Sequence, residues 1–190
     1  DGLLLEAHTQ VPENYRVYYN GWDRWSVLPK TPAVGIHHPT GDAKKISIAD
    51  GPITIGQWDS DGDKGAEKAH FVFQYTKGAT EGGSSGSSLF SAEHLVVGTL
   101  TGGRTKGDDF YGRLKFHWDH FKKNDSIDCM DIYLDPKEGG TARRLEGTWR
   151  NGLKPLQPVS DFKVQVTNTE ANLSWAAIDK NTIPAEWKVF

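Results

Sequence analysis

Apolar stretches along this chain are short, alternate with polar positions and are separated every few residues by Gly or Pro. They are rich in β-branched and aromatic residues, which favours β-strands over helices. Helical periodicity barely exceeds one turn, so the best helix candidate is 118–123, with turns near 141–145. This rhythm is typical of an all-β fold, either a sandwich or a barrel. The predicted strands are 17–19, 45–48, 53–55, 70–75, 89–90, 95–100 and 111–116.

The composition changes at 151–158, where Gly152, Pro155 and Pro158 predict a linker between a region 1–150 and a region 159–190. In the second region, 162–166, 172–175 and 187–190 predict strands. Three strands cannot close a sandwich, which needs about seven. The pattern that begins at Pro158 resembles the opening of a fibronectin type III or related immunoglobulin-like module. We therefore expect 159–190 to be the beginning of an Ig-like β-sandwich.

The charge balance excludes several classes of partner. The chain has 22 Lys+Arg, 25 Asp+Glu and a formal net charge of −3, without a block of like charge. This argues against nucleic acid or an acidic membrane surface as the main partner. No stretch approaches the roughly 18 apolar residues of a membrane span. The single cysteine, Cys129, excludes an internal disulfide and a multi-thiolate zinc site within this sequence, and no cofactor is predicted.

The segment 80–88, Thr-Glu-Gly-Gly-Ser-Ser-Gly-Ser-Ser, lies between two predicted strands. Its composition alone is that of a flexible linker. The order Gly-x-Ser-Gly-Ser before a strand is also what an acyl-transfer nucleophile requires, a serine on a tight turn flanked by glycines. The backbone N–H groups of Gly83 and Ser85 could then converge on a developing oxyanion.

Three further stretches, 18–24, 35–39 and 109–113, occur with this loop in an order that resembles chymotrypsin-like serine proteases, and more closely the bacterial lysyl endopeptidases. The resemblance covers residues 1 to about 147. It implies the second β-barrel of a two-barrel protease, a short C-terminal helix and secretion from the cell. It also implies that Ser85 is the nucleophile and that Gly83 contributes to the oxyanion hole.

A serine needs a histidine to take its proton and a carboxylate to orient that histidine. The resemblance implies that Asp1 is this carboxylate; the alternative is an ordinary polar terminus. In the family the histidine lies N-terminal to that Asp, and no histidine of this sequence matches it. Either a segment or chain preceding Asp1 supplies the histidine, or the chain is inactive.

Substrate specificity is implied by the acidic residue before an aromatic-Tyr-Gly-Arg strand. In lysyl endopeptidases this position binds the basic side chain of the substrate, and Asp109 occupies it here. The alternative is an acidic turn at 107–109. Thr101, Gly102 and Gly103 resemble the strand that pairs with substrate backbone and forms a pocket wall. The predicted partners are polypeptides with Lys, or with Arg, which carries the same charge.

Two details complete the sequence prediction. Ser84 stands where trypsin has the Asp that pairs with a newly freed N-terminus, so activation by that ion pair is not expected. Residues 59–63 place carboxylates at alternating positions, as calcium loops do, but Lys64 and His70 replace the Gly and Glu of such a loop. A β-turn without metal is expected there.

Three functions remain open on the sequence alone. The first is a secreted serine endopeptidase that cleaves after Lys. The second is a catalytically inactive, protease-like module that binds peptide or protein. The third is an adhesion-type β protein whose trailing module carries the function.

Overall fold

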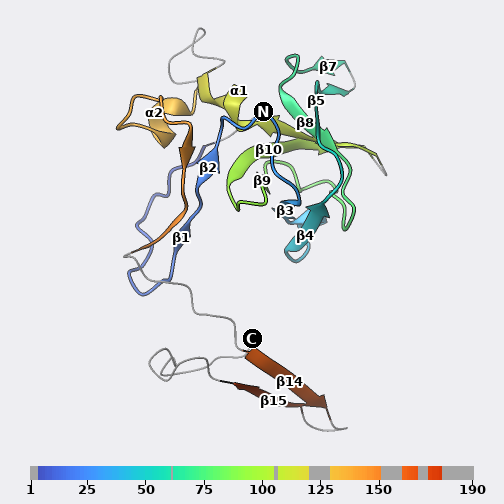
Figure 1. Cartoon of the computed structure of the whole chain (residues 1–190), viewed down its shortest axis with the longest axis vertical. Coiled ribbons are helices and arrows are strands. Elements are labelled where there is room, and N and C mark those ends of the chain that lie inside the picture. Colours follow the sequence, from blue (N-terminus) through green and yellow to red (C-terminus); the bar gives the residue numbers. More distant parts are fainter. Residues whose placement is uncertain are drawn as a thin grey trace. The chain divides into compact units, whose positions relative to one another are not determined.

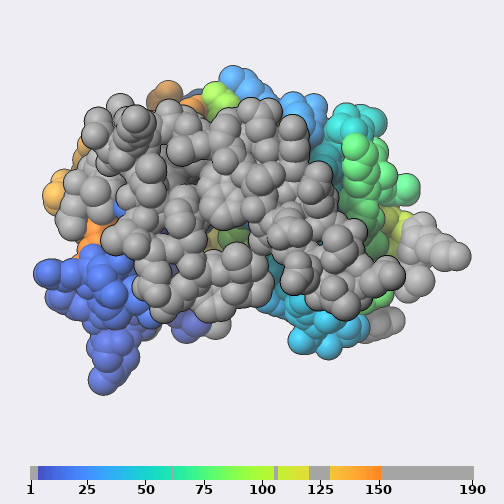
Figure 2. All heavy atoms as spheres, turned by 90° about the horizontal axis from the view of Figure 1, so that it is seen from below, coloured from blue at the N-terminus to red at the C-terminus, as the bar shows by residue number. Residues whose placement is uncertain are grey.

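A computed structural model describes residues 4–60, 62–104, 107–119 and 129–150, together with the backbone of the strands at 160–166 and 171–176 (Figure 1). The chain divides into two compact units, 1–148 and 149–190. No helix within the described residues combines the length and the apolar character that crossing a membrane requires. Residues 4–17 form neither helix nor strand, and most of them are exposed. They belong to the blue part of Figure 2, at the margin of that view.

The first unit is built on one large, mainly antiparallel sheet that carries most of the predicted strands. Its strands follow the order β4-β3-β9-β10-β11-β8-β5, and β2 joins β10 in parallel while β12 pairs with β2. The bounds are β2 (Trp22–Asp23), β3 (Ala33–His37), β4 (Lys45–Ala49), β5 (Thr54–Gly56), β8 (His70–Phe73), β9 (Ser88–Phe90), β10 (Val96–Gly103), β11 (Asp109–Arg113) and β12 (Arg144–Leu145).

The remaining elements are short. Two-stranded sheets join β1 (Tyr18–Tyr19) to β13 (Thr148–Trp149), β6 (Asp59–Ser60) to β7 (Asp63–Lys64), and β14 (Ser160–Val166) to β15 (Ala171–Ala176). The helices are a 3₁₀ turn at Pro39–Gly41, α1 (Leu114–Asp119) and α2 (Asp131–Leu134). The all-β class is therefore confirmed.

The β4 edge of the large sheet also meets the chain that follows β8. Ile48 accepts backbone hydrogen bonds from Thr76 and Lys77 and donates one back to Lys77. This link is the arrangement expected of a sheet that curls toward a barrel. The barrel itself remains a prediction.

Two apolar clusters stabilise this unit, because alternation along each strand sends every second side chain inward. Within the first cluster, Phe73 stacks on Tyr111 with ring centroids 5.5 Å apart. The second joins Trp22 of β2 to Leu114 and Trp118 of α1. The first cluster consists of Ala33, Ala49, Ile53, Phe71, Phe73, Leu89, Val97, Leu100 and Tyr111.

Two sequence predictions were wrong at their edges. The strand predicted at 111–116 ends at Arg113, because Leu114, His117 and Trp118 are buried at helical spacing and begin α1 there. The helix predicted at 118–123 therefore starts four residues earlier, and residues 120–123 lie outside the described residues. Strand β3 was not predicted, because glycine disfavours a β-strand and Gly35 lies in its centre.

Of the predictions for region 159–190, two strands are confirmed and the others are not tested. The strands expected at 162–166 and 172–175 are present in β14 and β15, which pair antiparallel. The linker at 151–158 and the strand at 187–190 lie outside the described residues. The Ig-like character of this region stays a prediction.

Candidate active site

The segment 80–88 forms a defined double turn. The Ser84 N–H donates to the Glu81 carbonyl at 3.0 Å, and the Ser87 N–H donates to the Ser84 carbonyl at 3.1 Å. Gly83 and Gly86 have φ of +93° and +79°, in the region that favours glycine. The Gly86 N–H donates to the Leu100 carbonyl of β10 and so fixes the turn against the large sheet.

Two amides of the turn, on either side of Ser84, belong to exposed residues. Gly83 and Ser85 are exposed, while Ser84 between them is only 1% exposed. Among the described residues, no protein acceptor is found for the N–H groups of Gly83 and Ser85, although their neighbours at 84 and 86 are bonded. A pair of unengaged amides flanking a serine can stabilise an anion that forms on a bound carbonyl.

Ser85 borders a cavity of about 670 Å³ that runs between the turn and the end of β10. Gly102 and Gly103, both predicted as pocket wall, line it. Thr101 does not: it lies at an irregularity in the pairing of β10 with β11, and its hydroxyl contacts His70 Nε2, 3.0 Å away. The complete lining is Trp58, Ala79, Thr80, Glu81, Gly82, Ser85, Leu100, Gly102, Gly103 and Arg104.

Asp109, the first residue of β11, lies directly behind two of these lining residues. Its carboxylate accepts a hydrogen bond from the Thr80 hydroxyl. A Cβ at Gly103 would lie 2.6 Å from Asp109 Oδ1, so only glycine leaves the carboxylate accessible from that side. Ser85 thus lines the cavity, and Asp109, 24 positions later in sequence, does not line it but contacts Thr80 and Gly103, which do.

The electrostatics of Asp109 suit a cationic ligand. The residue is 6% exposed, and within the described residues no Lys, Arg or His forms an ion pair with it. Burial raises the pKa of Asp109 and the nearby Asp108 adds to this, while the Thr80 hydrogen bond opposes it. A buried carboxylate without a counter-charge is unfavourable until a cation binds beside it.

Trp58 lines the cavity, although no motif in the sequence marks it as a cavity residue. The ring lies against β10, because a Cβ at Gly102 would be 2.7 Å from its Cη2 atom. Phe110 supports the ring edge-on, with centroids 5.3 Å apart. Gly102 thus makes room for an aromatic wall, a contact between distant residues that spacing alone cannot indicate.

The rest of the predicted triad is not assembled in the described residues. Asp1 lies outside them. No described histidine hydrogen-bonds Ser85: His37 contacts Ser47 and Ser84, His38 contacts the Asp42 carbonyl, His70 contacts Thr101, and His117 contacts Thr99. Burial lowers the pKa of both His70 and His117 to about 4, so both are neutral near pH 7.

The predicted acidic turn at 59–63 is a hairpin, in which Asp59 pairs with Lys64 and Ser60 with Asp63. Gly62 has φ of +84° at its tip, and Asp61 lies outside the described residues. Across the described part of the chain, no group of three or more His, Cys, Asp or Glu side chains is placed to hold a metal ion.

Comparison with known proteins yields matches over the same region. The model of the family described as "Lysyl endopeptidase, C-terminal domain" matches residues 1–113. A curated lysyl endopeptidase from Pseudomonas aeruginosa is 32% identical over 112 residues, which cover 59% of this chain and 22% of that protein. The residues that the family model matches contain the turn, strands β1 to β11 and Asp109.

Proposed function

This chain belongs to the lysyl endopeptidase C-terminal domain family, and on that premise we propose that it is the part of a secreted serine endopeptidase that carries the nucleophile and the specificity pocket. The observation that carries the proposal is a cavity that Ser85 borders and in which two other lining residues, Thr80 and Gly103, contact Asp109 behind them. The predicted second β-barrel of a chymotrypsin-like protease is part of this proposal.

The proposed reaction is acyl transfer to Ser85. Its Oγ attacks the carbonyl carbon on the carboxyl side of a substrate lysine, and a histidine takes the hydroxyl proton. The amides of Gly83 and Ser85 hold the oxyanion, and one such donor is worth about 3–4 kcal/mol. The amine leaves with the proton from the histidine, and water then releases the acyl group by the same steps.

The histidine is proposed to come from a segment preceding Asp1, with Asp1 holding its ring in position. This chain spans 22% of the Pseudomonas aeruginosa protein it matches. The fact that no described histidine reaches Ser85 supports an external general base.

A preference for Lys is supported by the Asp109 carboxylate, which has no ion-pair partner among the described residues and lies behind two lining residues of a cavity with two glycines in its wall. A long unbranched side chain can extend past Gly102 and Gly103 and bring its ammonium to the carboxylate. The Thr80 hydroxyl holds one carboxylate oxygen in place. Arg carries the same charge, so the assay has to compare both residues.

The proposal is tested by covalent labelling with a fluorophosphonate, using the protein that contains this chain and any segment preceding Asp1. We expect labelling of the unmodified protein and of Ser88→Ala, a control in the adjoining strand β9. We expect no labelling of Ser85→Ala. Equal labelling of Ser85→Ala and the unmodified protein would reject Ser85 as nucleophile.

A catalytically inactive peptide-binding module is the second candidate, favoured by the same lack of a histidine beside Ser85 among the described residues. A peptide with one internal Lys distinguishes the two functions. Cleavage after the Lys supports the endopeptidase, whereas saturable binding of the intact peptide without cleavage supports the binding module.

A further inference from the structure

Three buried polar side chains form a row behind the turn that carries Ser85. His37, at the end of β3, is 2% exposed, and Ser47 of β4 and Ser84 of the turn are each 1% exposed. His37 Nδ1 lies 2.9 Å from Ser84 Oγ, and its Nε2 lies 2.9 Å from Ser47 Oγ. The row lies outside the cavity lining, so none of its members is placed to touch substrate directly.

The neighbours of this row assign its proton positions. The Ser47 hydroxyl donates to the Ala79 carbonyl at 3.4 Å, so Ser47 Oγ accepts from His37 Nε2–H. His37 Nδ1 is then unprotonated and accepts the proton of the Ser84 hydroxyl, while Ser84 Oγ accepts from the Glu81 N–H at 3.3 Å. Burial lowers the pKa of His37, and His38 lowers it further, which favours this neutral form.

Ser84 lies between Gly83 and Ser85 in the turn. The Ser85 N–H belongs to the peptide unit that Ser84 and Ser85 share, whereas the Gly83 N–H belongs to the preceding unit, between Gly82 and Gly83. The Ser84 side chain points into the protein while its neighbours face solvent. A shift of the Ser84 side chain would therefore rotate the peptide unit that carries the Ser85 N–H, and through the Gly83 backbone it would also move the unit that carries the Gly83 N–H. With Gly83 at φ +93°, the backbone beside it has little intrinsic preference for the observed conformation.

We infer that His37 is a positioning residue of the oxyanion hole, which fixes the Gly83 and Ser85 amides by accepting a hydrogen bond from the Ser84 hydroxyl. The inference rests on the proposed function, since it gives these amides a role in acyl transfer. Ser47 connects the row to β4. The glycine at position 78 leaves room for the Ser47 hydroxyl, because a Cβ there would lie 2.4 Å from Ser47 Oγ. The row thus joins the turn to two strands of the rigid sheet, β3 and β4.

The experiment compares two amide substitutions in the protein that contains this chain and any segment preceding Asp1. In His37→Asn the amide oxygen can take the place of Nδ1 and still accept from Ser84. In His37→Gln the amide reaches Ser47 and leaves Ser84 without an acceptor. Both remove the ring, so they are matched in lost packing.

With a peptide ester of lysine, we expect His37→Gln to lower kcat about 100-fold, the scale of one lost oxyanion donor, with KM within threefold. We expect His37→Asn to retain at least ten times more kcat than His37→Gln. Affinity for a lysyl boronate, which forms a tetrahedral adduct on Ser85, should fall with kcat. Affinity for n-butylammonium, which occupies only the Asp109 end of the cavity, should not.

Ser84→Ala removes the hydrogen bond between Ser84 and His37 and leaves the imidazole packed. This variant tests the inference if the His37 variants do not fold. It should lower kcat to a similar extent, and combining it with His37→Gln should add little, because both remove one interaction. Equal kcat losses in His37→Asn and His37→Gln, or full kcat in Ser84→Ala, would overturn the inference. If Ser85→Ala hydrolysed the ester normally, the proposed function itself would fail instead.

Discussion

At the scale of single residues, Asp109 combines burial with the absence of an ion-pair partner among the described residues. Folding gains nothing from such a carboxylate, because its charge is partly desolvated and only the Thr80 hydroxyl compensates. A bound ammonium supplies the missing charge. The proposed role of Asp109 in binding a cation therefore predicts effects on activity and on unfolding that differ in sign.

For activity, we expect Asp109→Asn to reduce kcat/KM for cleavage after Lys by about 10²–10³-fold, because loss of one partner of a buried ion pair costs about 3–5 kcal/mol. The amide can still accept the Thr80 hydrogen bond, so the cavity keeps its shape. Asp108→Asn is the matched control: its carboxylate bonds Gln74 at an exposed site, and cleavage should change less than threefold. Equal effects of the two substitutions would contradict the role of Asp109.

For stability, the raised pKa of Asp109 means that the native state binds a proton more tightly there than the unfolded chain does. The contribution of this group to the free energy of unfolding is therefore greatest below the ordinary carboxyl pKa and is lost as pH rises through the raised value. Asp109→Asn, which does not ionise, does not lose this contribution to the free energy of unfolding as pH rises. We expect a higher thermal midpoint than the unmodified protein at pH 7 and a smaller difference at pH 4, measured by circular dichroism. A lower midpoint at pH 7 would show that the carboxylate stabilises the fold.

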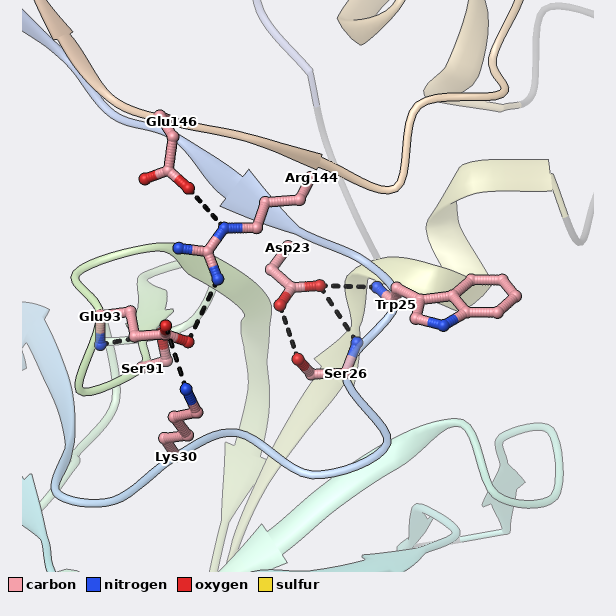
Figure 3. Close-up of polar contacts among 8 residues, drawn as sticks. All are labelled: Asp23, Trp25, Ser26, Lys30, Ser91, Glu93, Arg144 and Glu146. Carbon is pink, nitrogen blue, oxygen red and sulfur yellow. Dashed lines mark hydrogen bonds and ion pairs between the residues drawn. The ribbon is translucent and has the colours of Figure 1, made fainter.

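At the scale of elements, the short strands β2 and β12 are held by two polar clusters of different kinds (Figure 3). The Asp23 carboxylate, buried at the end of β2, accepts hydrogen bonds from the Trp25 and Ser26 N–H groups at 2.8 and 3.0 Å and from the Ser26 hydroxyl at 2.5 Å. Arg144 of β12 instead forms ion pairs with Glu93 and Glu146 near the surface.

These contacts predict unequal losses. Asp23→Ala leaves backbone donors without their acceptor in a partly buried turn and should cost about 1–3 kcal/mol in the free energy of unfolding. Arg144→Ala removes only exposed pairs and should cost less than about 1 kcal/mol, less still in high salt. Urea denaturation followed by tryptophan fluorescence measures both. A loss for Arg144→Ala as large as that for Asp23→Ala would contradict this assignment.

The elements that sequence reasoning found are those with local signals. Alternation in 70–75 and 95–100 marked β8 and β10, and the order of Gly and Ser marked the turn at 80–88. Strand β3 was not predicted because the reason for its glycine is a contact with a residue distant in sequence. A Cβ at Gly35 would lie 2.2 Å from the Tyr75 hydroxyl. Glycine is selected there by close approach of another side chain, and no local pattern encodes that.

The site shows the same division. The family resemblance indicated Ser85, Gly83 and Asp109, and the structure brings Ser85 and the contacts of Asp109 to one cavity. Neither Trp58 beside Gly102 nor His37 beside Ser84 could be predicted. His37 and Ser84 are 47 positions apart, and the pairing of β3 with β9, with the Thr40 N–H bonded to the Gly82 carbonyl, brings their segments together.

At the scale of the whole molecule, the two apolar clusters draw all their buried members from residues 22–118. The large sheet and the two-stranded sheets β1–β13 and β6–β7 are complete with β13, which ends at Trp149. Burial of these clusters, at about 25 cal/mol per Å² of apolar surface, is the dominant stabilising contribution. The buried apolar core of the first unit therefore lies within residues 22–118.

We accordingly expect a chain shortened to residues 1–150 to unfold in one cooperative transition, with its thermal midpoint within about 3 °C of the same transition in the full chain, a shift below about 1 kcal/mol for a domain of this size. A chain ending at Arg143 is the control. It loses β12 and the pairing of Arg144 and Leu145 with β2, and it should melt several degrees lower. If 1–150 instead unfolded without cooperativity, residues 151–190 would belong to the folding unit and the division of the chain near residue 150 would be wrong.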